Sequence, residues 1–167
     1  FAYSKTPAGK DTSTVISNTF APAYVLLSLG IDYKPTDNFS LFISPLTERW
    51  VIVTNDSIAP LFGVLPGKNS KNELGAFLSA NYTAKLGSNF VYKTKLDLFS
   101  NYKQKPQNVD IYWTNALTAK ITKYINFSFT LDMIYDDNTK NVNPVKGPAP
   151  QWLQLMGVGF AYNFRKK

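Results

Sequence analysis

The segment INFSFTLDMIY, Ile125–Tyr135, alternates apolar and polar side chains almost without interruption. Apolar residues occupy the odd positions, and Ile134 is the one apolar residue at an even position. Successive side chains of a β-strand point to opposite faces, so this segment predicts a strand with one apolar and one polar face. Its eleven residues exceed the usual length of a soluble strand and match a tilted strand that crosses a bilayer.

The same alternation continues before and after this segment. Pro45 interrupts one of the expected strands, and because proline cannot donate a ladder hydrogen bond we expect a bulge there. The sequence leaves open on which face of the strand Glu48 and Arg49 lie. Asn115 falls on the apolar face of its strand. The other expected strands are Tyr24–Pro35, Phe39–Val53, Glu73–Leu86, Phe90–Tyr102, Val109–Thr122 and Gln151–Phe164.

The connections between these strands alternate between short and long. This is the hairpin topology of outer-membrane barrels, which have short periplasmic turns and longer outside loops. A short helical turn is expected within Ser57–Phe62. The short connections lie near Thr36, Ser88 and Lys123, and the long ones are Lys5–Asn18, Asn55–Asn72, Lys103–Asn108 and Asp136–Pro150.

The sequence therefore predicts an all-β fold, an antiparallel up-and-down transmembrane β-barrel. Counting the connections makes Phe1–Tyr3 the outer end of an earlier strand. We expect residues 1–167 to be the C-terminal portion of one barrel domain, with about seven full strands plus the end of one. The whole barrel would have roughly 12 strands, an even number as in single-chain bacterial barrels. An exported protein needs a signal peptide, which we expect upstream of residue 1.

The composition fits a barrel and excludes several kinds of chemistry. Aromatic residues make up 15% of the chain, yet the mean hydropathy is only -0.17. A barrel combines the two because polar lumen residues dilute an apolar outer face. No apolar run approaches the roughly 18 residues of a spanning helix. Cys and His are both absent, which excludes disulfides, His-based triads and the common zinc sites within these residues. No cofactor is expected.

The formal net charge of +7 raises the question of an acidic partner. The lysines are dispersed over strands, turns and loops, with one cluster at Arg165–Lys167. This dispersion argues against nucleic acid as a partner and favours anionic lipid head groups. We expect the partners to be the lipid bilayer with its lipopolysaccharide and the barrel-assembly machinery, with other outer-membrane proteins as an open alternative.

Two resemblances agree with this interpretation. Phe160, Tyr162 and Phe164 resemble the C-terminal signature of bacterial outer-membrane proteins, an aromatic strand ending in Phe, although Arg165–Lys167 follow it here. The segments DYKPTDNFSLFISPLTERWVIV, TKLDLFSNYKQKPQNVDIYWTNALTAKITKYINFSFTLDMIYDD and GVGFAYNF resemble an uncharacterised outer-membrane barrel family of Bacteroidota, which carries a domain-of-unknown-function label. The resemblance covers Val15 to Phe164. It implies a Gram-negative outer membrane as the location and further strands upstream, and it supplies no catalytic residues.

Charged residues on the predicted inward faces are the candidates for a functional site. Neighbouring strands are expected to form a mixed-sign ladder that either lines a solute path or fills and seals a narrow barrel. Bulky inward residues favour a filled or narrow lumen; they are Phe42, Phe77, Phe99 and Tyr112. The lumen-facing polar candidates are Lys93, Lys95, Asp97, Asp110, Lys120 and Asp132.

Aromatic residues near strand ends or on the apolar face predict the girdles of a membrane protein. A ligand that stacks on some of them is the alternative. The residues concerned are Tyr92, Tyr102, Trp113, Tyr135, Trp152 and Tyr162.

The predicted function is that of a non-enzymatic outer-membrane barrel, serving as a structural component, an assembly partner or a narrow, porin-like channel. Two alternatives stay open. The first is an outer-membrane enzyme of lipase or acyltransferase type, whose catalytic residues would lie in an N-terminal part outside this chain. The second is a soluble, lipocalin-like ligand-binding barrel, in which the apolar face would point inward.

Overall fold

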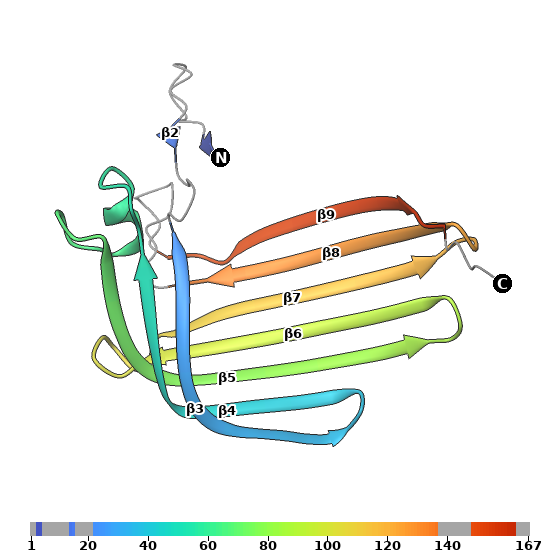
Figure 1. The fold of residues 1–167 in the computed structure, drawn as a ribbon, viewed down its shortest axis with the longest axis horizontal. Helices are drawn as coiled ribbons and strands as arrows, with labels where there is room; N and C mark the ends of the chain where they lie inside the picture. The colour runs from blue at the N-terminus through green and yellow to red at the C-terminus, as the bar shows by residue number, and fades with distance from the viewer. Residues whose placement is uncertain (1–2, 5–13, 16–21, 137–147, 163–167) are drawn as a thin grey trace.

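Seven consecutive strands of the chain form one antiparallel sheet in which each strand pairs with the next (Figure 1). The computed structural model describes residues 3–4, 14–15, 22–136 and 148–162. The predicted all-β, up-and-down strand order is confirmed over this region. The edges of the sheet are β3 and β9, and no pairing joins them among the described residues. The strands are β3 (Ala23–Thr36), β4 (Phe39–Ile52), β5 (Ser70–Leu86), β6 (Phe90–Asn101), β7 (Val109–Lys120), β8 (Ile125–Tyr135) and β9 (Gln151–Phe160).

Two short strands near the N-terminus form a separate sheet. Strand β1 (Tyr3–Ser4) pairs antiparallel with β2 (Thr14–Val15), so a short strand interrupts the expected loop Lys5–Asn18. Phe1 lies outside the described residues. A further strand of the main sheet at Phe1–Tyr3 therefore stays a prediction.

The strand boundaries differ from the expected ones mainly at the long connections. Residues 70–72, expected in a loop, belong to β5 because they pair with Trp50–Ile52 of β4. Strand β7 ends at Lys120 instead of Thr122, and β9 ends at Phe160. Phe164, the last residue of the outer-membrane signature, lies outside the described residues. The alternation of short and long connections is confirmed.

The sheet bends sharply where β3, β4 and β5 lie side by side (Figure 1). The pairing of β5 with β6 ends at this level, at Gly75 and Asn101. In β4 an extra residue interrupts the pairing with both neighbours. Ile43 and Leu46 face Ile31 and Leu29 of β3, and Ser44 and Thr47 face Phe77 and Gly75 of β5. The bulge predicted from Pro45 is thus confirmed.

The carbonyl groups set free by the bulge have hydrogen-bond donors nearby. Tyr102 Oη donates to the Pro45 carbonyl oxygen over 2.6 Å. Ser44 Oγ lies 2.8 Å from the Leu29 carbonyl oxygen and 2.9 Å from that of Leu46. These donors offset the ladder hydrogen bonds that a bulge interrupts. The bulge is therefore built into the local sequence rather than tolerated as a defect.

Close backbone contact at the bend requires glycine in the two neighbouring strands. A Cβ on Gly30 would lie 2.3 Å from the Ile43 carbonyl oxygen, and one on Gly75 would lie 2.1 Å from that of Ser100. Both obstacles are main-chain atoms, which cannot move without opening the ladder. Glycine therefore lets three strands turn together at one level.

Replacing Gly75 with alanine is expected to lower the free energy of unfolding by about 1–3 kcal/mol, since the new methyl group would force β5 away from β6. Gly159→Ala is the matched control, because a Cβ there meets nothing within 4 Å. It should change stability by less than about 0.5 kcal/mol. Denaturant unfolding followed by tryptophan fluorescence measures both, and equal midpoints for the two variants would contradict this role for Gly75.

A small apolar core lies beyond the bend, where the connection between β4 and β5 folds back. It contains a 3₁₀ helix, η1 (Ala59–Phe62), within the predicted helical turn. Gly63 ends η1 with a φ of 69°, and the Val64 amide donates to the Ala59 carbonyl. No helix in the described part of the chain is long and apolar enough to cross a membrane. The buried residues of this core are Val51, Val53, Ile58, Ala59 and Val64.

Candidate functional site

The bend gives the sheet an inner and an outer face. Arg49, on the bent part of β4, contacts Phe99 of β6 and Asp110 of β7, which lie on the unbent part. Side chains meet across a bend only on its inside, so we name this side the inner face and the opposite side the outer face. Because side chains alternate along each strand, Glu48 lies on the outer face. The structure thus decides what the sequence left open: Arg49 faces inward and Glu48 outward.

A buried group of charged side chains on the inner face is built around Arg49. Its Nε donates to Glu73 Oε2 over 2.6 Å, and one Nη donates to Asp110 Oδ2 over 2.6 Å. The three residues are only 3–4% exposed. Charge-assisted hydrogen bonds of this length are strong, and a guanidinium offers donors in the fork geometry that two carboxylates require. The three strands β4, β5 and β7 are therefore joined through one side chain.

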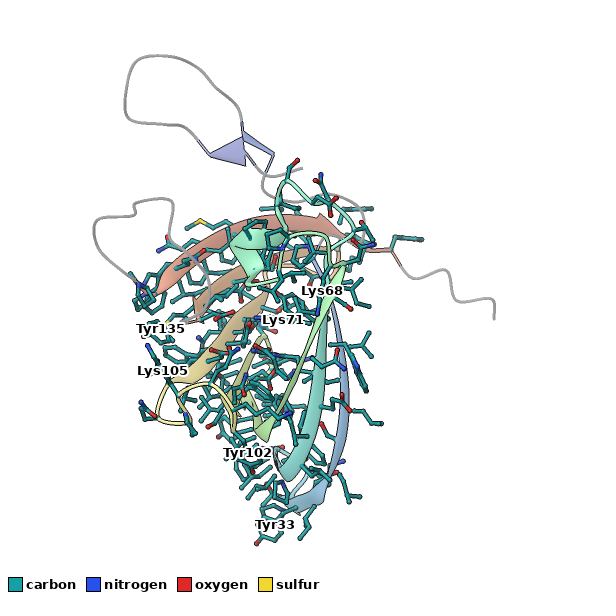
Figure 2. All side chains as sticks on the ribbon, turned by 90° about the vertical axis from the view of Figure 1, so that its left-hand side faces the viewer. Tyr33, Lys68, Lys71, Tyr102, Lys105 and Tyr135 are labelled. Carbon is teal, nitrogen blue, oxygen red and sulfur yellow. The ribbon has the colours of Figure 1, made fainter. Side chains whose placement is uncertain are left out.

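Two further contacts complete the surroundings of Arg49. Its guanidinium carbon lies 4.0 Å from the centre of the Phe99 ring, a cation–π contact. Lys71 Nζ lies 3.0 Å from Glu73 Oε1, and Figure 2 shows Lys71 inside the curve of the sheet. We name Arg49, Lys71, Glu73 and Asp110 the Arg49 cluster; it contains two positive and two negative groups.

Neutrality of this cluster suits a structural role. Within the described residues, no group of three or more acidic side chains is placed to hold a metal ion. The two carboxylates that come together, Glu73 and Asp110, both bind Arg49. A buried ion pair of this kind fixes one arrangement of strands, because separating the partners would strand a charge away from water.

Three of the predicted polar candidates, Lys95, Asp97 and Asp110, form ion pairs on the inner face of β6 and β7. Lys95 Nζ lies 2.8 Å from Asp97 Oδ2 within the same strand, and Ser79 Oγ donates to Asp97 Oδ1 over 2.6 Å. Asp110 instead belongs to the Arg49 cluster. The cross-strand partners of Lys95 and Asp97 are Thr114 and Tyr112. The expected ladder is therefore made of an ion pair along one strand and a cluster at the bend.

The remaining predicted candidates stand apart from this group. Lys93 faces Ala116 on the next strand, and both Lys93 and Lys120 are exposed. Asp132 faces Thr114, and its Oδ1 is buried without a hydrogen-bond partner among the described residues. These three residues have no ion pair within the part of the chain that the structure describes.

The bulky residues predicted to point inward do share the inner face. Phe42 and Phe77 lie with their ring centres 6.3 Å apart in a tilted arrangement. Phe99 lies beneath Arg49, and Tyr112 faces Asp97. Aromatic rings therefore cover much of the inner face near the bend.

On the outer face of β6 and β7, a polar network lies within an apolar surface. Asn115 Oδ1 accepts hydrogen bonds from Tyr92 Oη over 2.7 Å and from Thr94 Oγ1 over 2.9 Å. Trp113 Nε1 donates to Thr94 Oγ1 over 2.9 Å. Asn115, the residue that interrupted the apolar pattern, is thus paired by its neighbours.

Sequence reasoning missed Arg49 and Glu73 as members of the site. A signal was present in their opposite charges, but only the strand register shows that they are cross-strand partners. Asp110 is 61 residues from Arg49, and no local pattern links them.

Comparison with known proteins found no relative of this chain. No protein-family model matches the chain, and neither a curated protein nor a solved structure matches it. Membership of the Bacteroidota barrel family therefore stays a prediction based on the resemblance of the segments, and the function rests on the geometry of the sheet.

Proposed function

We propose that this chain is part of an outer-membrane β-barrel of Gram-negative bacteria, with a structural or narrow-channel role and no catalytic one. The observation that carries the proposal is the sheet itself. Seven neighbouring antiparallel strands are each 10 to 17 residues long, and a tilted membrane strand needs about 9–11. Their outer face is apolar and their inner face bears most of the charges.

Large apolar side chains on the outer face are left open to the surroundings. Leu29 is 72% exposed, Ile31 75%, Met156 73% and Val158 77%. Exposed apolar surfaces larger than a few hundred Å² are rare on soluble monomers and indicate contact with a membrane or a partner. Strands β3 and β9 are edges, which raises these fractions. Trp113, well inside the sheet, is still 36% exposed.

The hydrogen bonds of the outer face fit a hydrocarbon environment. An unpaired polar group in lipid costs several kcal/mol. Tyr92, Thr94 and Trp113 satisfy Asn115 and one another, as described above. Such self-contained pairing is what a polar residue near the middle of a lipid-facing strand requires.

The position of the apolar face argues against a soluble ligand-binding barrel. In that class of protein the apolar side chains line the cavity, whereas here they cover the outside of the bend. The inner face holds the Arg49 cluster and the Lys95–Asp97 pair instead. Ile134, Leu153 and Leu155 are exceptions near the β9 edge, because the register pairs Ile134 with Gln151 and Leu153 with Asp132. Together with the inward aromatic rings, they favour a filled or narrow lumen.

Closure of the barrel requires further strands between β3 and β9. Open sheet edges are not tolerated in lipid, because their N–H and C=O groups would lack partners. Seven strands are also an odd number, and single-chain bacterial barrels have an even one. We propose that this chain forms the C-terminal portion of a barrel of roughly 12 strands, inserted by the barrel-assembly machinery.

Heat modifiability of the full-length protein tests the membrane proposal. Membrane barrels stay folded in cold detergent, so the unboiled sample should migrate differently from the boiled one on a detergent gel, and the protein should be recovered with the membranes. Identical migration together with recovery in the soluble fraction would overturn the proposal. Conductance in planar bilayers then separates a narrow channel from a purely structural barrel.

A further inference from the structure

A cleft of about 400 Å³ lies inside the bend of the sheet, beside the Arg49 cluster. Tyr24 and Leu26 of β3 line it from the bent part, and aromatic residues of β5, β6 and β7 line it from the unbent part. These are Phe77, Phe99 and Tyr112. The volume falls within the roughly 300–1,000 Å³ typical of small-molecule sites, whose walls are also mainly apolar and aromatic.

Each cation at the cleft has an acidic partner. Arg49, Lys95 and Asp97 reach it. Arg49 is held by two carboxylates, and Lys95 by Asp97. Asp136 adds a further negative charge within electrostatic reach of Tyr24 and Tyr112. An anionic ligand would give up its hydration here without meeting a free cation, which is unfavourable. The cleft therefore disfavours anions.

Two hydroxyl groups give the cleft its hydrogen-bonding capacity. Tyr24 and Tyr112 both line it. A phenolic hydroxyl both donates and accepts. The rings of Phe77, Phe99 and Tyr112 offer surfaces on which another ring packs in an offset or edge-to-face arrangement.

We infer that this cleft binds a ring-containing small molecule that has a hydroxyl or carbonyl group and no negative charge. Its ring lies between Leu26 and the aromatic wall, and its oxygen bonds the hydroxyl of Tyr24 or Tyr112. This goes beyond the proposed barrel function and does not depend on it, since every wall of the cleft belongs to strands already paired in the sheet.

A matched pair of probes tests the chemical class of the ligand. The folded full-length protein is titrated with 2-naphthol and with 2-naphthoate, which share a ring system and differ in charge, and binding is followed by saturation-transfer NMR. We expect saturable binding of 2-naphthol and at least roughly tenfold weaker binding of 2-naphthoate. Equal or tighter binding of 2-naphthoate, or no saturable binding of 2-naphthol, would overturn the inference.

Three variants place the binding in the cleft. Leu26→Trp fills it and should abolish binding of 2-naphthol. Leu27→Trp adds the same ring to the neighbouring residue on the outer face and should bind like the natural protein. Tyr112→Phe keeps the ring but removes the hydroxyl, so binding should weaken roughly three- to tenfold.

The three variants must also differ from one another for the inference to stand. Equal affinity in the Leu26→Trp and Leu27→Trp proteins would place the site elsewhere, and unchanged affinity in the Tyr112→Phe protein would refute the hydrogen bond. Heat modifiability measured on the same samples reports the barrel separately, so that a failure of one idea is not mistaken for a failure of the other.

Discussion

Replacing Arg49 with methionine is expected to lower the free energy of unfolding by about 3–5 kcal/mol. The substitution leaves Glu73 and Asp110 buried at 3% exposure without their shared cation. It also removes the guanidinium that joins β4 to β5 and β7. Denaturant unfolding monitored by the fluorescence of the three tryptophans measures the loss.

Two comparisons separate charge burial from a general loss of packing at Arg49. Lys34→Met removes an ion pair with Asp32 that spans 3.0 Å but is 64% and 48% exposed; exposed pairs are worth less than about 1 kcal/mol. Adding Glu73→Gln and Asp110→Asn to Arg49→Met removes the stranded carboxylates and should recover most of the stability. A triple variant as unstable as Arg49→Met alone would contradict the electrostatic explanation.

Placing arginine at Phe129 is expected to destabilise the membrane-inserted protein by about 2–4 kcal/mol, the usual cost of a cationic side chain at the bilayer midplane. Phe129 lies near the middle of β8, and the register aligns it with Leu117 and Met156 on the outer face. We expect reduced membrane insertion and a smaller heat-modifiable fraction on a detergent gel.

Thr130→Arg is the matched control for Phe129→Arg. Thr130 is the next residue of the same strand and faces inward, where it is aligned with Ala116 and Leu155. The same charge at the same depth should therefore be tolerated far better. Equal insertion of both variants would mean that the two faces meet similar surroundings, and the lipid-facing assignment would have to be abandoned.

Local alternation was sufficient to predict the strands and their order. Every second side chain of Ile125–Tyr135 lies on the same face whatever the strand pairs with. The structure places this strand where the sequence predicts it. Short polar connections then force neighbours to run antiparallel, which is why the meander of seven strands could be predicted without knowledge of any contact.

The candidate site could be predicted only in part, because the bulge in β4 shifts which residues of that strand face inward. Lys95, Asp97 and Asp110 belong to β6 and β7, whose pairing is regular, so alternation predicts the face that each occupies. Arg49 follows the bulge at Pro45, where the two sets of alternating residues are both mixed in polarity. The sequence of β4 alone therefore does not decide whether the even-numbered or the odd-numbered residues after Pro45 face inward.

The sequence by itself determined an antiparallel sheet of long, two-faced strands, because period-two alternation is a property of each strand alone. The tertiary structure decided where the sheet bends and which charges meet inside it. The bend arises where Gly30 and Gly75 let neighbouring backbones approach. It brings Arg49 to an aspartate 61 residues away, a contact that depends on the packing of three strands together.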